Sequence, residues 1–233
     1  MEEYKEEFID FLLRKGALGI GEFELRSGRI SPHFINTAVF NDGESIAKVG
    51  DFYARTIVDN FREEDYDIIF GPAYKGITLS VATAISLQEL FSINKGFSYN
   101  RKEPKGYGEA TKQDKQKWIV GKIEDGDRIL MVDDVLTTGG TKYEAIDLLN
   151  SIADNLEYVG LVIAVDRKEV GPDGKDAIKQ FEQKTGIPVI SIVDILEIKT
   201  YLYDKGEISE AELKRIDDYL KKYGNEEVKR WVK

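Results

Sequence analysis

The chain of 233 residues is 42% hydrophobic and 33% charged, carries a formal net charge of −10 and contains no cysteine. This length and composition predict one domain with a substantial core, or one domain with a small appendage. The excess of acidic residues argues against nonspecific nucleic-acid binding, which needs a basic surface. The absence of cysteine excludes disulfides, cysteine nucleophiles and thiolate metal sites, and it fits the reducing cytoplasm where we expect the protein.

Membrane association is not expected either. The longest apolar runs, such as residues 159–165, fall far short of the ~20 residues that span a bilayer. The acidic start, residues 1–7, lacks the basic segment and the apolar core of a signal peptide. The sequence therefore predicts neither a membrane nor a nucleic acid as a partner.

The pattern of apolar residues predicts the elements in chain order. A helix over residues 2–15 comes first, followed by a hairpin over 23–36 and an amphipathic helix over 44–61. Strands and helices then alternate as strand 67–70, helix 76–90, strand about 96–99, strand 128–132, helix 140–152, strand 158–165, helix 174–185 and strand 188–193. This alternation predicts an α/β fold with a central parallel sheet and helices on both faces.

The ends of the predicted strands carry the residues that suit chemistry. Ligands of such sheets bind outside the carboxyl ends of the strands, so we expect Gly71, Asp133 and Asp166 to converge on one site. The C-terminal stretch predicts a helix from the capping box at 209–212 to Tyr223, and then a short final turn. We expect these C-terminal elements to be structural.

The segment 128–141 is the most informative part of the chain. An apolar strand, Ile129–Val132, runs into two adjacent acids, and a turn rich in hydroxyl groups and glycine leads to a helical pattern that opens at about Thr141. Backbone N–H groups at such a turn and at a helix N-terminus bind anions. The carboxylates of Asp133 and Asp134 would repel a phosphate and suit vicinal hydroxyls or Mg²⁺ instead. The implied ligand is a sugar phosphate with free hydroxyls.

Other nucleotide motifs are absent from the sequence. A dinucleotide fold needs G-x-G-x-x-G after a strand, whereas the glycines of 16–21 have the wrong spacing and follow a helical pattern. A P-loop needs a lysine after its last glycine, but Ile77 stands there in the 71–76 loop. The simple alternative for 128–141 is the polar turn of any α/β protein, and we consider the coincidence of strand, acid pair and hydroxyl–glycine turn too specific for that.

Two basic features complement the acid pair. Lys75 lies on the glycine-bracketed loop 71–76, where a fixed ammonium group would attract a pyrophosphate, although an ordinary turn lysine is the alternative. Basic residues outnumber acidic ones between Arg101 and Lys122, which would concentrate an anionic substrate on an acidic protein. A solvated surface loop is the alternative for this second feature.

Five stretches of the chain resemble one family in one order. They are Phe-Glu-Leu-Arg-Ser-Gly-Arg-Ile-Ser-Pro (23–32), Phe-Gly-Pro-Ala-Tyr-Lys-Gly (70–76), Asn-Arg-Lys-Glu (100–103), the 128–141 segment and Val-Asp-Arg-Lys-Glu (165–169). Together they resemble orotate phosphoribosyltransferase, one of the type I phosphoribosyltransferases, over about residues 4–203. The resemblance implies Mg²⁺-dependent transfer of the 5-phosphoribosyl group from phosphoribosyl pyrophosphate (PRPP) to orotate, giving orotidine 5′-monophosphate and pyrophosphate in pyrimidine synthesis.

The resemblance also implies an organisation of the chain. A helix and hairpin hood over the base pocket would occupy residues 1–40, and the type I phosphoribosyltransferase core would occupy 41–203. This core would carry a mobile loop at about 101–118, whose residues reach the neighbouring subunit of a homodimer. A C-terminal helical appendage would occupy 204–233.

The implied site residues fall into three groups. Catalytic roles are expected for Lys75, Arg101, Lys102, Lys105, Asp133 and Asp134. PRPP contacts are expected for these six and for Arg26, Tyr74, Tyr107, Val135, Leu136, Thr137, Thr138, Gly139, Gly140 and Thr141. Orotate contacts are expected for Phe34, Ile35, Thr137 and Arg167, whose planar guanidinium suits the orotate carboxylate. Mg²⁺ is expected mainly through PRPP near Asp133 and Asp134, with no certain protein ligand.

The sequence departs from the family pattern at several positions. Arg26 stands where the family has a lysine, Ile35 where it often has an aromatic residue, and Tyr107 where its loop has a histidine. The only histidine, His33, lies in the hairpin and suits a structural role or a pocket wall. We still expect activity, because the transition state needs charge neutralisation of the leaving pyrophosphate rather than a titrating imidazole.

Two further functions are compatible with parts of this sequence. A related transferase could use another base, but Arg167 and the 23–36 hairpin argue against it. A non-catalytic PRPP-binding regulator would carry a DNA-binding segment and a basic face, and this acidic chain has neither. Changing Asp133 and Asp134 to Asn is expected to abolish most turnover and to leave the fold intact.

Overall fold

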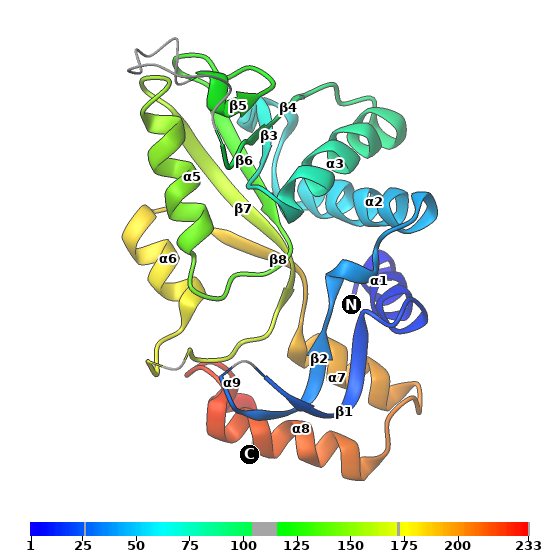
Figure 1. Ribbon diagram of the computed structural model, residues 1–233. Helices are drawn as coiled ribbons and strands as arrows, with labels where there is room; N and C mark the ends of the chain where they lie inside the picture. Colours follow the sequence, from blue (N-terminus) through cyan, green and yellow to red (C-terminus); the bar gives the residue numbers. More distant parts are fainter. Residues whose placement is uncertain (26, 104–115, 172, 233) are drawn as a thin grey trace.

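A six-stranded sheet forms the centre of the protein in the computed structural model, which describes residues 1–25, 27–103, 116–171 and 173–232 (Figure 1). The strands lie in the order β5-β4-β3-β6-β7-β8, and all neighbours are parallel except the edge pair β4 and β5. Their bounds are β3 Ile68–Gly71, β4 Gly96–Asn100, β5 Ile119–Val120, β6 Arg128–Asp133, β7 Glu157–Asp166 and β8 Val189–Asp194. The predicted parallel sheet is therefore confirmed, with one short antiparallel strand added at its edge.

Both faces of the sheet are buried, which explains why its central strands are apolar at successive positions. Along β6, Leu130 and Val132 pack into one core, and Ile129 and Met131 pack into the other. Helices α1 (Glu3–Arg14), α2 (Gly43–Asn60) and α3 (Lys75–Phe91) contribute to the first core. Helices α5 (Gly140–Asn150) and α6 (Ala177–Thr185) cover the opposite face. The expected arrangement of helices on both faces is confirmed.

The N-terminal hairpin and the C-terminal helices lie at one end of the core (Figure 1). Strands β1 (Leu18–Glu24) and β2 (Ile30–Ile35) form an antiparallel hairpin, and α8 (Glu210–Tyr223) packs against β2. Helix α7 (Ile195–Asp204) connects the sheet to α8, and α9 (Val228–Trp231) follows. The N-terminal hairpin and the C-terminal helix α8 therefore lie side by side. Short 3-10 turns occupy Thr37–Val39, Glu63–Asp65 and Gln116–Trp118.

Several boundaries differ from the sequence prediction. The hairpin begins at Leu18 rather than at residue 23, because the glycine-rich stretch 18–21 pairs with β2. Helix α6 begins three residues late, since the Asp176 side chain caps the N–H groups of Ile178 and Lys179. Helix α7 was not predicted, although Asp194 and Glu197 form a capping box at its start. No helix among the described residues is long and apolar enough to cross a membrane.

Candidate active site

Three adjacent strand ends bring the candidate site residues together. Strands β3, β6 and β7 are neighbours and run parallel. Their last residues, Gly71, Asp133 and Asp166, therefore lie side by side at the carboxyl end of the sheet. The segments that follow these residues leave the sheet side by side, as the sequence predicted for ligand-binding loops. The hairpin and α8 approach the core at this carboxyl end of the sheet (Figure 1).

The loop after β6 has the form of an anion cradle. Gly139 precedes α5 with a φ of 75°, and a Cβ at this position would meet the Tyr143 ring at 3.0 Å, so glycine is required. Thr137, Thr138 and Thr141 are exposed. Their hydroxyls and the N–H groups of the first turn of α5 can therefore reach a phosphate from solvent.

The two adjacent carboxylates have different surroundings. Asp133 forms an ion pair with Lys142, and both side chains are less than one-tenth exposed. The Lys142 ammonium group also donates to the Val135 carbonyl oxygen at 2.8 Å, which fixes the start of the loop. Burial raises the pKa of Asp133 above its ordinary value, and Lys142 offsets only part of this rise. Asp133 is thus engaged within the protein, through a lysine that the sequence analysis missed.

Asp134 instead faces the loop after β3. Its Oδ2 accepts hydrogen bonds from Lys75 Nζ at 2.5 Å and from Thr37 Oγ1 at 2.8 Å. Burial would raise the pKa of Asp134, but these two hydrogen bonds and the lysine charge hold it below its ordinary value. The Lys75 side chain is 56% exposed, so an anionic ligand can reach it. Thr37, which follows the hairpin in a 3-10 turn, was not predicted as a site residue.

The loop after β3 presents Tyr74 and Lys75 at the surface. Tyr74 is 72% exposed, and Lys75 is the first residue of α3 rather than the tip of a turn. The Ala73–Tyr74 peptide is cis, and the Ala73 N–H donates to Asn100 Oδ1 at 2.8 Å. A Cβ on Gly71 would lie 1.8 Å from the carbonyl oxygen of Gly76, so only glycine permits this close contact between strand and helix.

A cavity of 690 Å³ lies between the hairpin and the carboxyl end of β7. Phe34 and Ile35 line it on the hairpin side, and Thr137 and Arg167 line it on the core side. These are the four residues that the resemblance assigned to the base. The Phe34 ring stacks on Phe23 at a centroid distance of 5.5 Å and is 40% exposed, so it offers an apolar surface to a planar ligand.

Glu169, another residue of this cavity, was not predicted as a site residue. Its Oε1 accepts hydrogen bonds from Arg167 Nε at 3.1 Å and from Arg167 Nη2 at 2.8 Å. His33 Nε2 lies 3.2 Å from the same oxygen, and the Tyr219 hydroxyl donates to Oε2 at 2.9 Å. Burial would raise the pKa of Glu169, but the hydrogen bond from His33 and the Arg167 charge hold it below its ordinary value. Helix α8, which we expected to be purely structural, therefore contacts a carboxylate that lines the cavity.

Arg29 fastens the hairpin to the segment that carries Arg167. Its Nη1 donates to the Val170 carbonyl oxygen at 2.7 Å, and its Nη2 donates to the Gly171 carbonyl oxygen at 2.9 Å. The guanidinium carbon lies 4.6 Å from the centroid of the Tyr223 ring. One arginine thus joins the hairpin, the loop after β7 and the end of α8.

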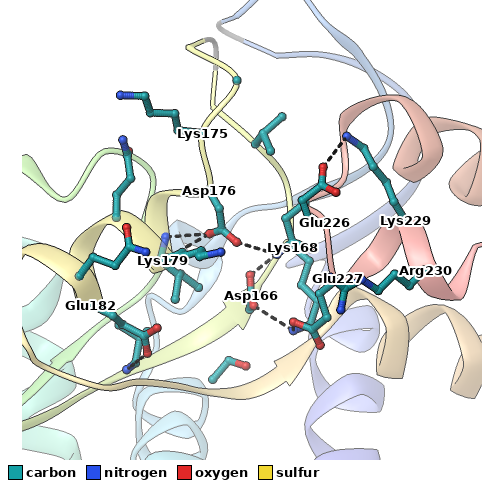
Figure 2. Close-up of a pocket in the computed structure, with 18 residues that line it drawn as sticks. Asp166, Lys168, Lys175, Asp176, Lys179, Glu182, Glu226, Glu227, Lys229 and Arg230 are labelled. Atoms are coloured by element: carbon teal, nitrogen blue, oxygen red, sulfur yellow. Dashed lines mark hydrogen bonds and ion pairs between the residues drawn. The ribbon is translucent and has the colours of Figure 1, made fainter.

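Lys168 places its ammonium group in a second cavity, of 860 Å³, which Asp176 of the loop before α6 and Glu227 before α9 also line (Figure 2). Its Nζ lies 3.5 Å from carboxylate oxygens of Asp166 and Asp194 and 3.1 Å from one of Glu227. Burial raises the pKa of Asp166 to about 6. Both acidic and basic side chains line this cavity, so neither sign of charge prevails there (Figure 2). Lys168 therefore links the end of β7, through Asp166, to the C-terminal region, through Glu227.

Part of the predicted site lies outside the described residues, namely Arg26, Lys105 and Tyr107. Of the predicted loop, the flanking residues are described. The Arg101 N–H donates to the Trp118 carbonyl oxygen at 2.6 Å, and Lys102 Nζ lies 3.6 Å from a carboxylate oxygen of Glu144 on α5.

Comparison with known proteins identifies the family of this chain. Residues 37–190 match the family model of the phosphoribosyl transferase domain. The chain is 42% identical to orotate phosphoribosyltransferase from Clostridium acetobutylicum over 229 residues, which cover 96% of this chain and 99% of the relative. It is 39% identical to that from Photobacterium profundum, with 96% and 100% covered. The crystal structure of the Francisella tularensis orotate phosphoribosyltransferase matches with a TM-score of 0.81 at 34% identity, over 94% of this chain and 100% of that one. The chain therefore belongs to the orotate phosphoribosyltransferase family.

Proposed function

We propose that the cavity and the strand-end loops beside it form the active site of this orotate phosphoribosyltransferase. The reaction transfers the 5-phosphoribosyl group of PRPP to orotate and releases pyrophosphate. One observation supports this site best: a lysine–carboxylate pair, a glycine–threonine cradle and a pocket arginine stand on three neighbouring strand ends. Each of these groups matches a different part of the two substrates.

The loop after β6 would hold the ribose phosphate. The 5-phosphate fits the cradle formed by residues 137–141, whose hydroxyls and N–H groups are open to solvent. Asp134, beside this cradle, is the carboxylate suited to accept hydrogen bonds from the ribose hydroxyls. In the free protein the Lys75 ammonium group lies 2.5 Å from Asp134. When PRPP binds, Lys75 would leave Asp134 and contact the pyrophosphate, because the pyrophosphate carries more negative charge.

Orotate would occupy the 690 Å³ cavity. Its planar ring fits against Phe34 and Ile35, and its carboxylate fits the Arg167 guanidinium. In the transfer step, the orotate ring nitrogen forms a bond to the anomeric carbon of the ribose. The bond from that carbon to pyrophosphate oxygen breaks, and its electron pair leaves with pyrophosphate.

The protein's contribution to this step would be electrostatic. Lys75, Arg101 and Lys102 supply positive charge that stabilises the leaving pyrophosphate. This mechanism does not require a general base. The orotate nitrogen reacts as an anion, so no side chain has to remove a proton. His33 is unsuited to that role in any case, because it is fully buried and faces Glu169.

Mg²⁺ fits this site as an ion carried mainly by PRPP. The described residues contain no group of three or more metal-ligating side chains. Asp134 is the better placed of the two carboxylates to assist, because its partner Lys75 is exposed and can turn to the pyrophosphate, whereas the partner of Asp133, Lys142, is buried. When bound, Mg²⁺ would neutralise pyrophosphate charge, which is consistent with its preference for phosphate oxygens and few carboxylates.

A homodimer that shares the loop at about 101–118 is the proposed assembly. Large apolar side chains of α3 and β4 are exposed in the single chain, namely Ile85, Leu90 and Phe97, which supports an interface on this side. Mixing a Lys102→Ala subunit with an Arg167→Ala subunit is expected to restore one intact site per dimer. Activity no greater than the sum of the two separate variants would contradict sharing across subunits.

A direct assay tests the reaction. The orotate absorbance is expected to fall when PRPP and Mg²⁺ are added to the purified protein, and to remain constant when either is omitted. A panel of other bases controls for a different acceptor. Intact PRPP binding without consumption of any base would favour a regulator instead.

A further inference from the structure

Glu169 contacts the Arg167 guanidinium along one edge only. Both hydrogen bonds, from Nε at 3.1 Å and from Nη2 at 2.8 Å, end on the same oxygen, Oε1. A guanidinium carries five N–H donors in a fixed fork. Two of the five are therefore taken by Glu169, and the remaining three lie on Nη1 and on the outer side of Nη2. Within the residues that the structure describes, the Arg167 side chain makes no other hydrogen bond.

The free edge of Arg167 is the one that suits a carboxylate. A planar carboxylate binds a guanidinium best through two parallel N–H groups. The Nε and Nη2 edge is occupied, so the Nη1 and Nη2 edge is the remaining place where a ligand in the cavity could form such a pair. Glu169 therefore determines both the orientation of Arg167 and the edge available to a ligand.

Glu169 itself has little freedom to move. Its side chain is 10% exposed, and both of its oxygens are engaged, by His33 from β2 and by Tyr219 from α8. The rings of His33 and Tyr219 are in edge contact at a centroid distance of 5.6 Å. Two elements that are distant from it in sequence, β2 and α8, thus hold this carboxylate in place behind the arginine.

We infer that Glu169 is a positioning residue for orotate recognition, which presents the Nη1 and Nη2 edge of Arg167 to the carboxylate of the substrate. This inference rests on the proposed assignment of orotate to the cavity. Glu169 does not touch the reacting atoms in this arrangement, so it acts only through Arg167. A different role for Glu169, as a simple tie between the hairpin and α8, would make no distinction between the two substrates.

The test is a double-mutant cycle on the full-length enzyme. Glu169→Ala is expected to lower kcat/KM for orotate about tenfold, the loss typical of one hydrogen bond to a charged group. It should act through the KM for orotate and leave the KM for PRPP unchanged. In an Arg167→Ala background the same change is expected to cost less than about twofold, because coupled residues are not additive. If Arg167→Ala is too slow to measure, Arg167→Lys, which keeps the charge without the fork, serves as the background.

Two variants separate positioning from stability. Glu169→Gln keeps an acceptor oxygen for Arg167 and is expected to recover most of the lost orotate affinity. Tyr219→Phe removes the hydrogen bond to Oε2 and leaves the contact with Arg167, so it should alter thermal unfolding more than the orotate KM. Glu226→Gln, an exposed acid with one surface ion pair, makes the same charge change as a matched control.

The outcomes are distinct. An equal loss from Glu169→Ala with and without Arg167, or an equal rise in the KM for PRPP, would overturn the positioning role. A wild-type protein that does not consume orotate would instead overturn the proposed function. Selective loss for orotate that disappears with Arg167 would establish the inference.

Discussion

The proposed active site has two ends, one for the ribose phosphate and one for the orotate base, and they are built in different ways. The ribose-phosphate end consists largely of one continuous segment, 133–142, with Lys75 and Thr37 placed against it. The base end combines His33, Arg167 with Glu169, and Tyr219, which come from the hairpin, the loop after β7 and α8. A continuous segment leaves a motif in the sequence, whereas a site assembled from distant segments leaves only isolated residues.

Both ends contain a buried carboxylate, but the two are compensated differently. Asp133 has one cationic partner, Lys142, and burial keeps its pKa above the ordinary value. Glu169 has donors on both oxygens, and its pKa is lowered in spite of burial. Comparable burial thus gives opposite shifts of the pKa: Asp133 lies beside the like charge of Asp134, whereas Glu169 is contacted by three side-chain donors, including the Arg167 cation. This contrast predicts which changes affect turnover and which affect folding.

The largest expected effect is on turnover at the ribose-phosphate end. Lys75→Ala should lower kcat by about 10²–10³, the usual cost of removing one group that stabilises developing negative charge. The free energy of unfolding should change less than for Asp133→Asn, because Lys75 is half exposed and the Asp134 carboxylate keeps its hydrogen bond from Thr37. Steady-state kinetics and thermal unfolding provide the measurement, and Lys229→Ala, a surface lysine paired with Glu226, is the control. Unchanged kcat would place pyrophosphate elsewhere.

The next largest expected effect is a difference in stability between substitutions of the two adjacent acids, Asp133 and Asp134. Asp133→Asn should destabilise the fold by about 3 kcal/mol, because it leaves Lys142 charged and buried without its partner. Asp134→Asn should change the free energy of unfolding much less and should mainly reduce PRPP binding. Urea unfolding and PRPP titration of both variants provide the comparison. The destabilisation expected for Asp133→Asn revises the expectation from the sequence that neither substitution would affect the fold. Equal stability of the two variants would show that the Lys142 pair is unimportant.

The smallest expected effect is a pH dependence of the free energy of unfolding that arises from Asp166, at the end of β7. Because burial raises the pKa of Asp166 to about 6 from an ordinary value of 3.8, the folded protein binds a proton there that the unfolded chain has already released. The free energy of unfolding should therefore fall as the pH rises from about 4 through 6. Asp166→Asn should remove about 1 kcal/mol of the decrease between pH 5 and pH 7.5. Urea unfolding at the two pH values checks this, and an identical decrease in both proteins would contradict it.

Most elements of the core were predictable from local patterns. The strands β3, β6, β7 and β8 are short apolar runs bounded by polar turns, and their predicted limits differ from the observed ones by about a residue. Helix α7 was missed, although Asp194 and Glu197 carry the sequence signal of a capping box. The edge strand β5 has only two residues, too few to show alternation.

The candidate site was predictable only in part. The acid pair, the threonines, Lys75 and Arg167 stand in motifs that the resemblance identified. Lys142 and Thr37 were missed because neither lies at a motif position with an evident ligand. Glu169 follows Arg167 by two residues, but the sequence shows no reason why this carboxylate should face the arginine.

The sequence by itself determined the parallel α/β core, the loop after β6 and the family, because these depend on apolar periodicity and on short contiguous motifs. Tertiary structure alone decided that Asp133 is held by Lys142 while Asp134 faces Lys75. It also decided that Tyr219, 50 residues beyond Glu169, donates a hydrogen bond to this carboxylate, which lines the cavity. The physical reason is that a charged side chain acquires its role from the partners that folding places around it, and those partners lie far away along the chain.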